Sequence, residues 1–121
     1  MEFLLQSRST QNANRTEDIM RRVKEYLYIN CGEDLTLEQV AEIFHFNATY
    51  LSSIFKQYTK TGFKEYVTSV RIERSKYLLK ETDLKVYEIA KQCGYPDAAY
   101  FVRLFKKEVG ISPNRFRGVS A

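Results

Sequence analysis

Residues 84–117, which read LKVYEIAKQCGYPDAAYFVRLFKKEVGISPNRFR, decide the fold. Apolar residues recur in this stretch every three to four positions, and this period predicts amphipathic helices rather than strands. Gly94 separates two helical segments, and glycine readily adopts the positive φ that a sharp turn between helices needs. Asp97 stands at the start of the second segment, where its side chain can cap the helix. The stretch therefore predicts two short helices joined by a tight turn.

The same plan is present earlier in the chain, over residues 35–66, which read LTLEQVAEIFHFNATYLSSIFKQYTKTGFKEY. Corresponding apolar positions are offset by 49 residues before the turn, as in Val40 and Ile89, and by 50 after it. The inserted residue falls in the turn, where a duplicated unit can absorb it. We therefore expect two copies of one helix-turn-helix, at residues 35–58 and 84–108.

A longer amphipathic segment over residues 63–80 is expected to connect the two copies. About 17 helical residues rise roughly 26 Å, which can place two helices near the roughly 34 Å of one DNA turn. A further helical pattern begins at Thr16, which we expect as its N-cap, and residues 1–15 are interpreted as a flexible arm or linker remnant. The expected fold class is all-α, with one domain over residues 16–121.

The second helix of each copy has an outward face suited to a DNA groove. Short or hydrogen-bonding side chains there allow a helix to enter the major groove and contact base edges. Arg103 is the side chain on this face able to make a bidentate contact with guanine, worth about 1–3 kcal/mol of discrimination. Taken alone, Ser52 and Ser53 are better explained as solvated surface, and only the repeat favours base or phosphate contact. The candidates for base contact are Thr49, Ser52, Ser53, Ala98, Ala99, Val102 and Arg103.

The charge pattern favours a polyanionic partner. The chain has a formal net charge of +4, and residues 84–117 hold seven Lys and Arg against three Asp and Glu. Residues 31–66 hold three Lys against five acids, so we expect the second copy to supply more of the phosphate attraction. Tyr50 and Tyr100 fit core tyrosines as well as phosphate contacts, and any single cation fits a solvated face. The candidates for phosphate contact are Tyr50, Lys56, Arg71, Arg74, Tyr100, Lys106, Lys107 and Arg115.

Several function classes lack a signature in this sequence. It has one His, and it contains no phosphate-binding loop, dinucleotide fingerprint or metal-ligand spacing, so we expect no catalytic residue, cofactor or metal. Cys31 and Cys93 are too few and too far apart for a disulfide framework or a zinc site, and we expect reduced thiols. No segment has the apolar length of a membrane span. We therefore expect a cytoplasmic protein with no membrane partner.

The series Ile89-Ala90, Gly94-Tyr95, Tyr100 to Lys107, Gly110 to Pro113 and Phe116-Arg117 resembles the signature of the AraC/XylS family of transcription regulators, specifically its C-terminal DNA-binding region. The resemblance covers roughly residues 19–117. It implies about seven helices, with two helix-turn-helix units joined by a long helix. Three positions depart from the family pattern: His45 and Lys60 replace common glycines, and Lys85 replaces a Ser or Thr cap.

The resemblance implies a bacterial, sequence-specific DNA-binding transcription regulator that inserts two recognition helices into successive major grooves. We expect an activator, with double-stranded DNA and RNA polymerase as partners. Family members usually carry an effector or receiver domain N-terminal to this region, so a missing domain of that kind is a further expected partner. The alternative is a protein-interaction module of a larger regulator, contacting RNA polymerase or such a domain. That alternative needs an exposed apolar stripe on a recognition helix, whereas the two faces read Thr, Ser, Ser in the first copy and Ala, Val, Arg in the second.

Overall fold

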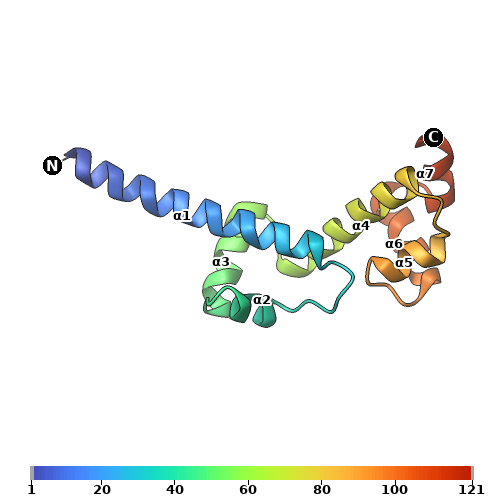
Figure 1. The fold of residues 1–121 in the computed structure, drawn as a ribbon, viewed down its shortest axis with the longest axis horizontal. Coiled ribbons are helices and arrows are strands. Elements are labelled where there is room, and N and C mark those ends of the chain that lie inside the picture. The colour runs from blue at the N-terminus through green and yellow to red at the C-terminus, as the bar shows by residue number, and fades with distance from the viewer. Residues whose placement is uncertain (1, 121) are drawn as a thin grey trace.

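The computed structural model describes the backbone of residues 2–120 and the side chains of residues 15–120. Within the described backbone the chain forms seven α-helices and no strand, which confirms the expected fold class (Figure 1). The expected flexible arm falls almost wholly on residues 1–14, outside the described side chains. Thr16 lies inside the first helix and is not its N-cap. The helices are α1 (Glu2–Ile29), α2 (Leu37–Ile43), α3 (Ala48–Thr59), α4 (Phe63–Glu81), α5 (Val86–Gln92), α6 (Ala98–Val109) and α7 (Pro113–Ser120).

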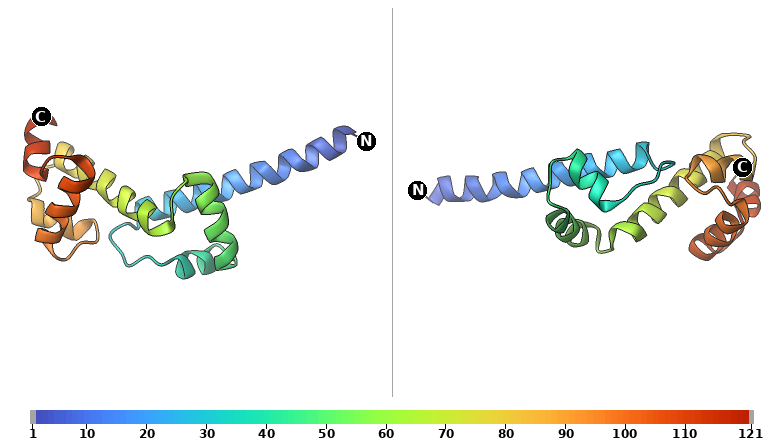
Figure 2. Two further views of the ribbon diagram at one scale, coloured as in Figure 1. Left: turned by 180° about the vertical axis from the view of Figure 1, so that it is seen from behind. Right: turned by 90° about the horizontal axis from the view of Figure 1, so that it is seen from below.

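The two helix-turn-helix units, α2–α3 and α5–α6, lie toward opposite ends of the connecting helix α4 (Figures 1 and 2). Corresponding helices have equal lengths, 7 residues in α2 and α5 and 12 in α3 and α6. Asn47 caps α3 by accepting hydrogen bonds from the amides of Thr49 and Tyr50, and Asp97 caps α6 in the same way. The sequence repeat is therefore a repeat of local structure, and the helical residues of one unit have counterparts in the other.

Both units turn through the left-handed backbone region at equivalent places. The turn between α2 and α3 has His45 at φ 60°, and its counterpart Gly94 has φ 91°. The C-caps of α3 and α6 are Lys60 at φ 64° and Gly110 at φ 97°. Side chains other than glycine are sterically strained in this region, so His45 and Lys60 leave local strain in the first unit.

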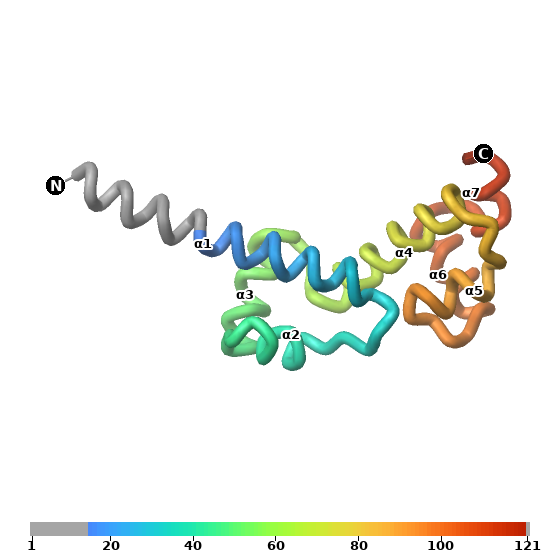
Figure 3. The backbone as a smooth tube through the Cα atoms, in the orientation of Figure 1, coloured from blue at the N-terminus to red at the C-terminus, as the bar shows by residue number. Residues whose placement is uncertain are grey.

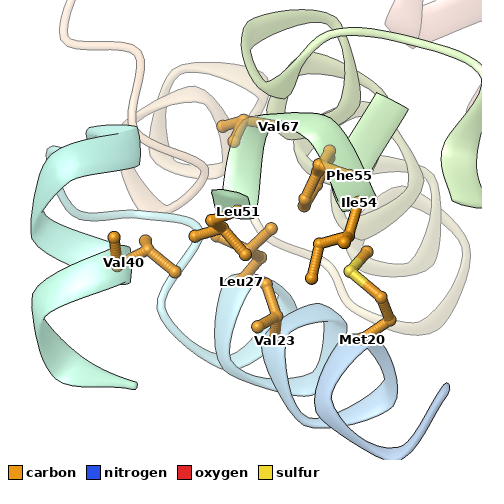
Figure 4. Close-up of a cluster of buried hydrophobic side chains, with 9 residues drawn as sticks. Met20, Val23, Leu27, Val40, Leu51, Ile54, Phe55 and Val67 are labelled. Atoms are coloured by element: carbon orange, nitrogen blue, oxygen red, sulfur yellow. The ribbon is translucent and has the colours of Figure 1, made fainter. Parts of the chain in front are cut away.

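The first hydrophobic core joins α1, α2, α3 and the start of α4. Figure 4 shows α1 side chains meeting those of α3, with Val40 of α2 and Val67 of α4 completing the cluster. Phe55 is almost fully buried and packs edge-on against Phe63 and Tyr66 of α4. This packing fixes the start of the connecting helix against the first unit, because aromatic pairs add directional contact to the burial of apolar surface.

A second core joins the end of α4 to α5, α6 and α7. Phe101 and Phe105 of α6 are fully buried, and they pack against each other and against Tyr95 and Phe116. Arg117 of α7 donates hydrogen bonds to the carbonyls of Leu79 and Thr82 at the end of α4, at 2.9 and 3.1 Å. These bonds satisfy carbonyl groups that a helix end leaves without partners. Figure 3 traces the backbone as α7 folds back beside the end of α4.

The loop after α1 connects the two units directly. A Cβ atom at Gly32 would lie 2.3 Å from the carbonyl oxygen of Gln92, so only glycine allows this approach of the loop to α5. Cys31 and Cys93, which flank this contact, are both buried and free, and their thiols are hydrogen-bond partners. The two cysteines are thus neighbours in space despite their distance in sequence. The hydrogen bond from Cys93 lowers the pKa of Cys31 to about 7.

Candidate nucleic-acid interface

The outward face of α3 is polar and exposed. Thr49, Ser52 and Ser53 are all exposed, on the side of the helix away from the buried Leu51, Ile54 and Phe55. With Lys56 they border a shallow hollow of about 420 Å³, whose other wall is Leu37 and Glu38 of α2. The structure thus brings together four of the residues that the sequence nominates, on one side of the first unit.

The outward face of α6 divides into two parts. Ala99 and Arg103 are exposed, whereas Ala98 and Val102 are half-buried against the second core. Ala98 and Val102 therefore lie at the border of the face and not on its crest, because their small apolar side chains pack inward. No intramolecular hydrogen bond or ion pair engages Arg103 within the described side chains, so its five N–H donors are available to a ligand.

Tyr50 and Tyr100 occupy equivalent positions in the two recognition helices. Each packs on an aromatic ring of the preceding turn, Tyr50 on Phe46 at 5.8 Å and Tyr100 on Tyr95 at 5.9 Å between ring centres. Their exposed fractions are 45% and 49%, so they are neither core residues nor fully solvated. Each ring therefore packs against the protein on one side, and the rest of its surface is open to a partner.

Two of the nominated phosphate contacts have structural partners instead. The guanidinium of Arg71 donates to the carbonyls of Cys31 and Glu33, at 2.8 and 2.9 Å, and lies over the ring of Tyr95 at 5.2 Å. It bridges the loop after α1 to the turn of the second unit and so has a structural role at their junction, while its expected phosphate contact stays a prediction. Sequence reasoning missed this role because the partners are distant in sequence and two of them are backbone atoms.

Arg74 lies between two tyrosine rings. Its guanidinium is 5.5 Å from the ring centres of both Tyr28 and Tyr77, and it donates to the Tyr28 hydroxyl at 3.5 Å. The pKa of Arg74 is raised above its ordinary value, first by that hydrogen bond. Arg74 therefore ties α1 to α4, while the phosphate contact expected from the sequence stays a prediction.

The remaining cations are exposed near the second unit. Lys106, Lys107 and Arg115 are all exposed, as is Lys56 in the first unit.

The described residues contain no group of three or more His, Cys, Asp or Glu side chains that could hold a metal ion. In the same part of the chain, no helix combines the length and the apolar character needed to span a membrane.

Comparison with known proteins gives a consistent result. The family described as a helix-turn-helix domain matches residues 40–118. An HTH-type transcriptional regulator of Escherichia coli strain K12, YijO, is 39% identical over 107 residues, which cover 88% of this chain and 38% of YijO. The bifunctional transcriptional activator/DNA repair enzyme AdaA of Bacillus subtilis strain 168 is 37% identical over 98 residues, covering 81% of this chain and 46% of AdaA. The chain thus spans less than half the length of these relatives.

A solved structure supports the same assignment. The C-terminal domain of AraT, a response regulator from Geobacillus stearothermophilus, aligns with a TM-score of 0.76 and 39% identity, covering 84% of each chain. The family match over residues 40–118 covers part of α2 and the whole of α3, α4, α5 and α6. The chain belongs to the AraC/XylS family of helix-turn-helix transcription regulators.

Proposed function

We propose that this chain is a sequence-specific double-stranded DNA reader, in which α3 and α6 enter successive major grooves. The observation that carries the proposal is the repeated unit, with equal helix lengths, equivalent N-caps and an exposed outward face on each second helix, polar on α3 and carrying Arg103 on α6. Helix α4 has 19 residues, and a helix of that length rises about 28 Å. With the width of the flanking helices added, this separation is compatible with one helical turn of DNA, roughly 34 Å.

Base reading is assigned to the exposed residues of both recognition helices. Thr49, Ser52 and Ser53 can exchange hydrogen bonds with base edges or phosphates, and Arg103 can bind guanine through two N–H donors. Ala99 is small enough to contact a thymine methyl group. Ala98 and Val102, at the border of the α6 face, would contribute mainly through the fit of the helix to the shape of the DNA.

Phosphate contacts are assigned mainly to the second unit. Lys106, Lys107 and Arg115 are exposed there, and they join Tyr100 and its counterpart Tyr50. Lys56 is the corresponding cation of the first unit. Such contacts position the protein on the duplex and make its affinity depend on salt.

A larger regulator is the proposed setting of this domain. The AraT domain, similar in sequence and fold, is described as part of a response regulator, which supports a receiver or effector domain elsewhere in the same protein. We infer an activator that contacts RNA polymerase in the bacterial cytoplasm, and we assign no enzymatic activity to this region. The alternative of a pure protein-interaction module is less well supported, because the large exposed apolar and aromatic residues of α3 and α6 are limited to the two tyrosines.

Selection from a random duplex library at two salt concentrations tests the proposal. The expected motif has two half-sites about 10 base pairs apart, and binding weakens steeply with salt. Arg103→Ala should relax preference at one base pair of one half-site, by about 5- to 150-fold. Glu108→Ala, which changes an exposed residue of the same helix, is the matched control. Equal binding of all sequences by wild type and variant would contradict specific reading and favour the interaction module.

A further inference from the structure

The two units carry side chains of different chemistry at equivalent positions beside their recognition helices. Glu38 is the second residue of α2, and its counterpart at the offset of 49 is Tyr87, the second residue of α5. Both side chains are exposed, Tyr87 with an exposed fraction of 59%. The residues that precede the two helices differ as well, because Thr36 of the first unit corresponds to Lys85 of the second. The same place in the fold thus carries an acid in one unit and a phenol beside a cation in the other.

Glu38 shares a surface hollow with the base-reading face of the first unit. It borders the same hollow of about 420 Å³ as Thr49, Ser52 and Ser53. The first helix of a helix-turn-helix crosses the DNA backbone when the second lies in the major groove, so this hollow faces the strand that borders the groove. An ionised carboxylate accepts hydrogen bonds only, and it repels phosphate. None of the ion pairs among the described side chains includes Glu38, and Lys56, the cation that borders the same hollow, is not paired with it.

Tyr87 and Lys85 present the opposite chemistry at the second unit. The ammonium group of Lys85 lies 5.9 Å from the centre of the Tyr87 ring, so the two side chains occupy one patch. The neighbouring Glu88 accepts a hydrogen bond from the backbone amide of Lys85 at 3.0 Å, which draws its carboxylate to the start of the helix. The phenol hydroxyl and the ammonium group are both donors to phosphate oxygen atoms.

We propose that Glu38 and Tyr87 make the two units hold the DNA backbone unequally. Tyr87 and Lys85 bind a phosphate group beside α6, whereas Glu38 repels the equivalent phosphate beside α3. The second unit is therefore the anchor, and the first unit adds affinity only where its base contacts offset the repulsion. This inference rests on the proposed DNA-binding function. It agrees with the charges of the two repeats, which are positive in residues 84–117 and negative in residues 31–66.

The test compares Glu38→Gln with Glu42→Gln. Glu42 is also exposed on α2 but borders a different hollow, with Tyr26 and Glu33, so the control removes the same charge from another face. Affinity for a selected duplex and for a random duplex is measured by fluorescence anisotropy at two salt concentrations, after circular dichroism confirms equal helix content. Glu38→Gln should tighten binding to both duplexes by about two- to fivefold, with a steeper salt dependence. Tyr87→Glu should weaken binding to both.

The outcomes separate the inference from the function on which it rests. If Glu38→Gln has no more effect than Glu42→Gln, the repulsion is absent and the inference is wrong, while DNA binding by the wild type stands. If Glu38→Gln weakens binding to the selected duplex alone, Glu38 accepts a hydrogen bond from a base such as cytosine, and the inference is again wrong. If the wild type binds no duplex at all, the proposed function fails, and the inference fails with it.

Discussion

Replacement of Arg71 by alanine should uncouple the two helix-turn-helix units. The change removes two charged hydrogen bonds, at 2.8 and 2.9 Å to the carbonyls of Cys31 and Glu33, and a cation–π contact with Tyr95. One bond is partly buried and the other is exposed, so the three contacts together should contribute about 2–4 kcal/mol to the free energy of unfolding. A loss of that size is a large fraction of the stability of a small domain.

Urea unfolding followed by far-UV circular dichroism measures this effect. Lys76→Ala is the matched control, since it removes a cation of the same helix whose exposed ion pair with Glu73 should contribute less than about 1 kcal/mol. Arg71→Lys should recover little stability, because an ammonium group lacks the planar array of donors that reaches both carbonyls.

A DNA-binding assay distinguishes this structural role of Arg71 from a contact with phosphate. A phosphate contact by Arg71 predicts that Arg71→Ala reduces the salt slope of DNA binding by about one, with unchanged stability, and that Arg71→Lys restores binding. Those observations together would refute the structural role of Arg71. The expected result is reduced stability in both Arg71 variants, with little change in the salt slope of the alanine variant.

Two further predictions concern the turns and the thiols. His45→Gly should raise the free energy of unfolding by up to about 1 kcal/mol, because the relief of backbone strain at φ 60° exceeds the cost of the added entropy of the unfolded chain. A lower free energy of unfolding in urea would contradict this prediction. Gly94→Ala should lower the free energy of unfolding by about 1–3 kcal/mol, since the new Cβ would lie 2.9 Å from the Arg71 guanidinium carbon. The lowered pKa of Cys31, about 7 against 9.0, favours its thiolate in the folded state. Stability relative to Cys31→Ser should therefore rise between about pH 7 and pH 9 under reducing conditions, and a constant difference would exclude it.

Local structure could be predicted from the sequence because its causes are local. Asn47 and Asp97 cap helices through amides two and three residues away, and the turn at Gly94 needs only the conformational freedom of glycine. The period of the apolar residues places Phe101 and Phe105 on the face of α6 that packs inward. The duplication and the outward faces of α3 and α6 follow from the same pattern, so the sequence alone predicts the all-α fold and the candidate reading helices.

Contacts between distant segments were decided only by the tertiary structure. Arg71 reaches carbonyl groups 40 and 38 residues away, and no periodicity marks a backbone oxygen atom as a partner. Cys31 and Cys93 become neighbours because the loop at Gly32 fits against the end of α5. Glu38 acquires a role only when α2 and α3 enclose a common hollow. Sequence pattern thus determines which residues face inward and outward on each helix, whereas packing determines which outward residues meet one another, because that depends on the relative placement of whole helices.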